Sequence, residues 1–309
     1  MDKKYIKRFI EDCPLTNFSD EGNVQEREVK LTEYLDKATE YININEEELA
    51  RAFWEENFVK SQVVILKNSP FLRRCLVFLD VVLGCFNYLI TKYIKQRKAT
   101  ESAEMLSVQI KNSVSLYKAI MTLAMNGCFH SVLSEYRTMY ESFVITKYLL
   151  LHPELIQVYK EHSEFLVLQI NKIGNNNTQE QDLKYDSFIN KYGKDFADNL
   201  GWTKSIIKNP KERKLITLAN ECQIENFFSP MYRISCNFVH PSSFASTSIV
   251  NPDFVQSFLN ACLYIIEYEL VDFIRECNVV KKDGVLIKNL IDFMFEDIQK
   301  DFGKNKRIF

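Results

Sequence analysis

The sequence predicts an all-α protein built as a multi-helix bundle. Glycine and proline are scarce, with 8 and 7 among 309 residues, which leaves few turn residues for the many hairpins of an all-β protein. Long stretches rich in Leu, Ile, Lys, Glu, Tyr and Phe run without such breakers. The composition, 46% apolar and 26% charged, is typical of a globular chain and excludes the collagen-like, coiled-coil and disordered classes.

The first 60 residues are expected to form an acidic arm of two or three amphipathic helices. From Asp20 to Lys60 there are twelve acidic and five basic side chains, whereas the whole chain has a net charge of only −2. The remainder is therefore mildly basic. That balance permits RNA or a small anionic ligand as a partner without requiring one.

Four long helices are expected next, each bounded by a recognisable signal. Thr100 is a suitable N-cap, Gly127 a suitable C-cap residue, and Pro153 both ends one helix and begins another. Helices of about this length joined by short turns form a bundle with a four-helix core. The expected ranges are about 71–95, 100–125, 128–151 and 153–173.

Further helices are expected over about 182–199, 225–240, 252–277 and 285–302. The predicted organisation is an arm over 1–60, a helical-bundle core over 61–277, and a C-terminal helix with a basic tail over 278–309.

The cysteines and the amino terminus favour the cytoplasm. The eight cysteines show no C-x-x-C pair, which is typical of reduced, buried thiols. The start of the chain lacks the apolar core of a signal peptide. The most apolar run, Cys75 to Ile90, contains Asp80 and Asn87, so we expect a buried core helix and no membrane association.

Common enzyme motifs are absent from the sequence. It has no G-x-G-x-x-G, no G-x-x-x-x-G-K-[S/T], no G-x-S-x-G and no H-E-x-x-H. None of the four histidines has a glutamate three positions before it, as the di-iron bundles require. No metal and no cofactor are therefore predicted.

The most informative segment is Tyr232-Arg233-Ile234-Ser235-Cys236-Asn237-Phe238-Val239-His240-Pro241-Ser242. On a helix, Arg233, Asn237 and His240 share one face at i, i+4 and i+7. Apolar residues flank this row, so we expect it to be buried. Burial of such groups is costly unless each finds a partner, and such costs are often found at functional sites.

A second polar row lies on the helix that begins near Cys128. His130, Ser134, Arg137 and Glu141 fall on one face. Because an arginine four residues before a glutamate is the weaker order for an ion pair within a helix, we expect pairing across helices. Glu141 is then expected to orient Arg233 or His240.

A structural interpretation of both rows stays open, because buried Arg–Glu and His–Asn networks also occur in cores without function. His152 and His162 are expected to be ordinary surface histidines.

Arg233 followed by His240 resembles the R-x(4–6)-H motif of the HEPN superfamily, all-α bundles that include many metal-independent ribonucleases. Together with Tyr136, Arg137, Glu141 and the His240-Pro241-Ser242 segment, the residues also resemble an uncharacterised bacterial domain family over about 100–245. The resemblance implies that His240 acts as general base or acid and Arg233 stabilises the transition state. The supporting residues that it implies are Asn237, Ser242, Glu141, Arg137 and Tyr232.

The resemblance further implies an RNA substrate, a homodimer, no metal ion, and a role as the toxic effector of an antiphage or toxin–antitoxin system, with a partner protein of that system. The alternative is a non-catalytic nucleotide- or protein-binding scaffold subunit.

Overall fold

The computed structural model describes residues 69–94, 100–174, 176–239, 252–279 and 281–301, together with positions 59, 62 and 66. Helices joined by turns make up this part of the chain, and it contains no strand. The predicted all-α, multi-helix bundle is therefore confirmed. The predicted acidic arm and the basic tail lie outside the described residues.

The chain divides into two compact units. Residues 1–70, 125–127 and 308–309 form the first unit, and residues 71–124 and 128–307 form the second. The helices below belong to the second unit, apart from Pro70 and Met125 at two helix ends.

The first two long helices begin and end close to the predicted positions. Helix α4 spans Pro70–Leu89 and continues as the π-helix η3, Ile90–Ile94. Helix α5 spans Glu101–Met125, and the Thr100 hydroxyl caps it by accepting a 3.1 Å hydrogen bond from the Ala103 amide. Gly127 follows with a φ of +72°, the left-handed conformation that a helix C-terminus favours in glycine.

A short turn joins the next two long helices. Helix α6 spans Phe129–Leu151, a 3₁₀ turn covers Pro153–Leu155, and α7 spans Ile156–Ile173. Helix α8 spans Gln179–Tyr192 rather than the predicted 182–199. It begins early because Thr178 and Gln181 form a capping box, and it ends at Gly193, whose φ is +88°.

Four helices complete the described chain: α9 over Leu215–Glu221, α10 over Glu225–Val239, α12 over Pro252–Glu276 and α13 over Lys281–Asp301. The short helix α9 was not predicted, and α13 begins four residues before the predicted start.

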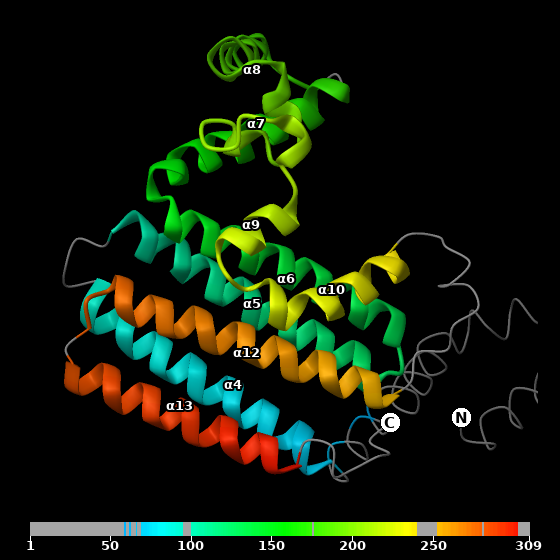
Figure 1. Cartoon of the computed structure of the whole chain (residues 1–309), viewed down its shortest axis with the longest axis vertical. Coiled ribbons are helices and arrows are strands. Elements are labelled where there is room, and N and C mark those ends of the chain that lie inside the picture. Colours follow the sequence, from blue (N-terminus) through cyan, green and yellow to red (C-terminus); the bar gives the residue numbers. More distant parts are fainter. Residues whose placement is uncertain are drawn as a thin grey trace, which may run out of the picture. The chain divides into compact units, whose positions relative to one another are not determined.

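Helices α4, α12 and α13 run side by side (Figure 1) and share an aromatic core. Phe86 of α4 meets Phe273 of α12 with ring centroids 5.1 Å apart. Phe78 of α4 meets Phe295 of α13 edge-on at 5.9 Å. On the other side of α12, Phe258 packs against Tyr136 of α6 at 4.8 Å. These buried rings hold the bundle together, since each removes a large apolar surface from water.

Helix α4 is longer than the apolar run that predicted a buried core helix. With its π-helical extension it covers Pro70–Ile94, which by length and composition is enough to cross a membrane, and it is the one such helix in the part of the chain that the structure describes. The apolar run Cys75 to Ile90 is therefore only the central part of a longer helix. Eight residues of α4 are nevertheless buried, which is compatible with a core helix of a soluble protein.

His162 corrects a sequence expectation. It is only 3% exposed, its Nε2 lies 3.1 Å from the Asp198 carbonyl oxygen, and its ring meets Phe196 edge-on. Burial lowers the pKa of His162 below its ordinary value. The prediction of a surface histidine was wrong because the 3₁₀ segment Lys194–Ala197 covers this face of α7, which the sequence pattern did not reveal.

Candidate functional site

Helix α10 packs along α6 (Figure 1), and Tyr232 contributes an aromatic contact and a hydrogen bond to this packing. The Tyr232 ring lies against that of Tyr140, with centroids 4.9 Å apart. Its hydroxyl donates a 2.9 Å hydrogen bond to Oε1 of Glu141. Tyr140 is fully buried, so Tyr232 fixes α10 to α6 through one apolar and one polar contact.

Arg137 completes this polar contact. Its Nε donates to Oε1 of Glu141 at 2.7 Å, and its guanidinium carbon lies 6.0 Å from the centre of the Tyr232 ring. The hydrogen bond with Glu141 raises the pKa of Arg137. Burial, followed by the Glu141 carboxylate, raises the pKa of Tyr232, so the phenol stays a donor. We call Arg137, Glu141 and Tyr232 the brace.

The brace changes the predicted pairing of Glu141. Arg137 and Glu141 do pair within α6, contrary to expectation, because one carboxylate oxygen accepts from both the guanidinium and the phenol. Among the described contacts, Glu141 reaches α10 through Tyr232 and not through Arg233.

Arg233 and Asn237 occupy the other side of α10, and both are exposed. Ser235 between them is buried and donates a 2.7 Å hydrogen bond to the Tyr232 carbonyl. Each residue turns the helix by 100°, so a helix that turns the half-buried Tyr232 and the buried Ser235 toward α6 directs Arg233 and Asn237 outward. The prediction that this row is buried was therefore wrong for these two residues.

The remainder of the α6 row lies near the end of α10. His130, in the first turn of α6, stacks on Phe238 with ring centroids 5.2 Å apart and an interplanar angle of 29°. Ser134 is half-buried between His130 and the brace. The polar row of α6 therefore lies alongside α10, with Glu141 at Tyr232 and His130 at Phe238.

His240 and Ser242, the remaining predicted site residues, lie outside the described residues. The sequence places His240 directly after Val239, the last residue of α10. The candidate site is therefore the exposed face of α10 with Arg233 and Asn237, followed in the chain by His240.

A buried polar cluster between α5 and α12 was not predicted from the sequence. Glu269 is completely buried, and its Oε1 accepts hydrogen bonds from Gln109 Nε2 at 3.0 Å and from Ser113 Oγ at 2.9 Å. Its Oε2 has no hydrogen-bond partner. Burial raises the pKa of Glu269 to about 7. The available signal was an acidic residue among the apolar positions of α12, such as Ile265, Ile266 and Phe273.

An ion pair lies one turn further along α12. Lys147 of α6 donates to Oδ2 of the buried Asp272 at 2.6 Å, and Arg275 reaches Oδ1 of the same carboxylate at 3.1 Å. Lys147 and Arg275 also line a shallow pocket of about 310 Å³ with Cys222. Burial raises the pKa of the Cys222 thiol to about 11, which makes it a poor nucleophile at neutral pH.

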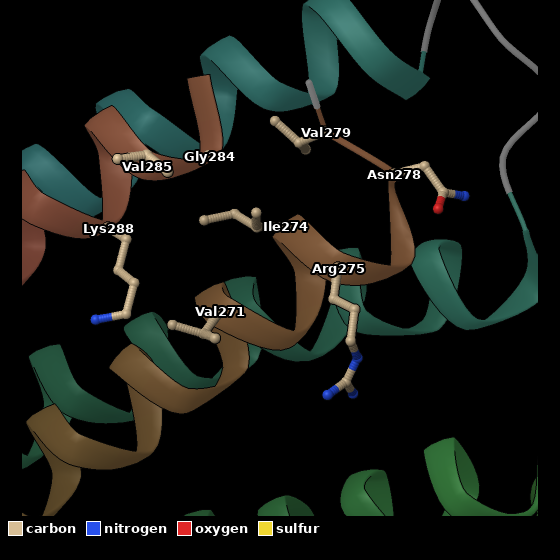
Figure 2. Close-up of a pocket in the computed structure, with 8 residues that line it drawn as sticks. All are labelled: Val271, Ile274, Arg275, Asn278, Val279, Gly284, Val285 and Lys288. Carbon is tan, nitrogen blue, oxygen red and sulfur yellow. The ribbon is translucent and has the colours of Figure 1, made fainter. Parts of the chain in front are cut away.

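A second pocket, of about 380 Å³, lies where α12 ends and α13 begins. Figure 2 shows its lining, which comes from the last turns of α12, the turn after it, and the first turns of α13. Most of the lining is aliphatic, with Arg275 and Lys288 at the rim. Neither pocket includes Arg233 or Asn237.

No group of three or more His, Cys, Asp or Glu side chains is placed to hold a metal ion among the described residues.

Comparison with known proteins gives one match. Residues 103–255, a little under half of the chain, are similar to a family of unknown function, DUF5677. The matched segment begins in α5 and ends early in α12, so it includes the brace, Arg233, Asn237 and His240. No curated protein and no solved structure matches the chain.

Proposed function

We propose that the chain is a metal-independent, HEPN-like endoribonuclease that acts as the toxic effector of a bacterial antiphage or toxin–antitoxin system. The observation that supports it is the exposed face of α10: Arg233 and Asn237 lie one turn apart and open to solvent, and the sequence brings His240 immediately after the helix. An RNA backbone can approach an exposed guanidinium, whereas it cannot approach a buried one.

In this proposal the residues have distinct tasks. His240 removes the proton of the ribose 2′-hydroxyl or protonates the departing 5′-oxygen. Arg233 offers a permanently charged fork to the phosphate as negative charge develops on it. Asn237 and Ser242 hold the phosphate oxygens. The reaction yields a 2′,3′-cyclic phosphate and a free 5′-hydroxyl and requires no cofactor.

The brace serves as support for these residues. Arg137 and Glu141 hold Tyr232 from α6, and Arg233 is the next residue of α10. A fixed helix keeps the guanidinium in place, which matters because catalytic groups act at short range and in defined orientation. The proposal also includes the cytoplasm as location, a homodimer, and a controlling partner protein of the same defence system.

The test is induced expression in bacteria of the wild-type chain, Arg233→Ala and His240→Ala, followed by growth and total-RNA integrity. Lys111→Ala is the matched control, because it removes an exposed cation far along the chain from the motif. We expect growth arrest and new RNA ends ending in cyclic phosphate for the wild type and the control, and intact RNA for the two motif variants. Equal RNA cleavage by all four chains, each folded by circular dichroism, would contradict the proposal.

A non-catalytic scaffold or binding module is the second candidate. The observation in its favour is that Glu141 is engaged by Arg137 and Tyr232, so these three predicted site residues serve to join two helices. If folded wild-type protein leaves RNA intact both in cells and after purification, this candidate is preferred.

A further inference from the structure

The segment between α8 and α9 carries a concentration of basic side chains. Residues 194–214, all of which the structure describes, contain six lysines or arginines and three acids, whereas the whole chain has a net charge of −2. The segment includes three 3₁₀ turns, Lys194–Ala197, Gly201–Thr203 and Pro210–Glu212, of which the first two pack against α7. It is therefore a folded basic segment on the surface of the bundle.

Two of the six cations hold the segment together. The Arg213 side chain is only 4% exposed, and it donates to Oδ2 of Asp195 at 2.8 Å and to the Ile207 carbonyl at 3.0 Å. Lys204 donates to Oδ1 of the same Asp195 at 2.6 Å. The hydrogen bonds from Lys204 and Arg213 lower the pKa of Asp195. This ion-pair network fixes the course of the chain between residues 195 and 213.

The last 3₁₀ turn of the segment is fixed separately by Asn209. Its Oδ1 accepts a 3.1 Å hydrogen bond from the Lys211 amide, and its Nδ2 donates to Oε1 of Glu212 at 3.0 Å. Pro210 restricts the backbone at the first position of the turn. Two of the three acids of the segment, Asp195 and Glu212, are therefore engaged within it.

Four lysines remain on the outside of this fixed segment. All four are exposed, and among the described residues no ion pair joins any of them to an acid. The pair between Arg213 and Asp195 brings the neighbouring residues 194 and 214 close together. Grouped cations that no acid compensates attract an extended polyanion. We call these four residues the basic platform: Lys194, Lys208, Lys211 and Lys214.

The surroundings of the basic platform favour a polyanion over a membrane or a protein. Residues 194–214 expose no large apolar side chain, since Phe196, Trp202 and Ile207 are buried. Binding to a lipid surface needs apolar side chains beside the charges, and protein interfaces are poor in lysine. An exposed aromatic ring, on which a base would stack, is also missing from this segment. Contact through backbone phosphates alone fits these features.

We propose that the basic platform binds the phosphate backbone of single-stranded RNA, without preference for the base, as a second RNA-binding site beside the exposed face of α10. The choice of RNA among polyanions rests on the proposed ribonuclease function. The platform ends at Lys214, directly before α9, and α9 packs against both α6 and α10. Both surfaces therefore belong to one group of packed helices.

Fluorescence anisotropy with a labelled 2′-O-methyl oligouridine measures binding to the full chain without cleavage, because this probe lacks the 2′-hydroxyl that the proposed reaction requires. Replacement of Lys208, Lys211 and Lys214 together by alanine should raise Kd at least about 30-fold at about 50 mM salt. The slope of log Kd against log salt concentration should fall by about 2, since each lost phosphate contact removes about 0.7 on a single strand. A 2′-O-methyl oligoadenylate should bind within about 3-fold of the oligouridine.

Two controls separate the position of the charges from their number. Lys111→Ala, Lys118→Ala and Lys300→Ala combined remove the same charge from exposed positions of α5 and α13, and they should change neither Kd nor the slope. Replacement of the three platform lysines by arginine keeps the charge and should keep the affinity. If the alanine variant does not fold, Lys211→Ala alone decides, with an expected loss of about 0.7 in the slope.

The outcomes distinguish this proposal from the proposed ribonuclease function. A wild-type chain that does not bind the probe at about 50 mM salt, or equal slopes for wild type and alanine variant, would overturn the platform. Equally tight binding of the wild type to anionic phospholipid vesicles would assign the surface to a membrane and would also overturn it. A chain that binds the probe and leaves RNA intact contradicts only the ribonuclease, whereas RNA cleavage with full affinity in the alanine variant contradicts only the platform.

Discussion

Glu141 and Glu269 are two carboxylates in one bundle that are held by different partners. Glu141 lies between α6 and α10 and is bonded by a cation, Arg137, and by the hydroxyl of Tyr232. Glu269 lies between α5 and α12, is fully buried, and receives hydrogen bonds only from the neutral groups of Gln109 and Ser113, on one of its two oxygens.

The difference shows how burial and partners together decide what a carboxylate does, since Glu141 is half-buried and Glu269 is fully buried. A cation compensates for the lost hydration of a carboxylate, so Glu141 serves as a charged link between helices. Neutral donors compensate only partly, and burial then raises the pKa of Glu269 to about 7. The first acid is suited to fixing a helix, and the second to taking up a proton near neutral pH.

Glu269→Gln should have the largest effect on how stability depends on pH. An unfolded glutamate loses its proton near pH 4.5, whereas folded Glu269 keeps its proton up to about pH 7. The wild-type free energy of unfolding should therefore fall as pH rises through this window, by about 3 kcal/mol in all, and then level off. Glutamine does not titrate, so the variant should lose this slope. Urea unfolding at a series of pH values measures both curves.

A substitution of a neighbouring charged residue serves as the control for this prediction. Lys147 and Asp272 are the charged groups that act on Glu269, while Gln109 and Ser113 of α5 are neutral. Asp272→Asn changes the charge one turn away and should shift the midpoint of the slope without removing it. Parallel pH profiles for the wild type and Glu269→Gln would show that Glu269 does not titrate in this window.

Glu141→Ala should lower the free energy of unfolding by less, about 1–2 kcal/mol. The site is partly exposed, so water can replace part of the lost interactions of the carboxylate. The substitution removes the ion pair with Arg137 and the acceptor of the Tyr232 hydroxyl. Glu141→Gln keeps an acceptor for that hydroxyl and loses only the charge, so it should cost less than alanine. Thermal unfolding of the two variants ranks them, and an equal or larger cost for glutamine would contradict the brace as described.

Tyr232→Phe isolates the hydrogen bond and should cost about 1 kcal/mol. The ring and its contact with Tyr140 remain, and only the hydroxyl is lost. A double-mutant cycle with Glu141→Gln should give a coupling energy of the same sign and of about this size. A coupling energy near zero would mean that the 2.9 Å hydrogen bond contributes nothing to stability.

The sequence predicted where the helices begin and end better than it predicted which of their faces pack together. Local signals placed α5 and α6 almost exactly, because a capping threonine at 100, a left-handed glycine at 127 and a proline at 153 act on the backbone within a few residues. The start of α8 was missed since its cap, Thr178, followed an asparagine run that resembled only a loop.

The side of α10 that is buried could not be read from spacing. From the spacing alone, either the side of α10 with Tyr232 or the side with Arg233 could face the bundle. Only the packing of α10 on α6 decides that Tyr232 and Ser235 face inward. Glu269 was overlooked for a related reason, because its donors, Gln109 and Ser113, are about 160 residues away in the chain. His162 was misassigned because the segment that covers it has no regular periodicity.

Arg233→Ala should have the smallest effect on stability, within about 0.5 kcal/mol, and this separates it from the brace. Its side chain is exposed, so removing it creates no cavity in the core. If the α10 face serves RNA cleavage, the variant should unfold at the wild-type temperature and yet lose its activity, whereas Glu141→Ala loses stability first. Thermal unfolding and RNA cleavage measured on the same preparation distinguish the two. A strongly destabilised Arg233→Ala would instead place Arg233 among the groups that hold α10 in position. That result would contradict a catalytic role for the exposed face of α10.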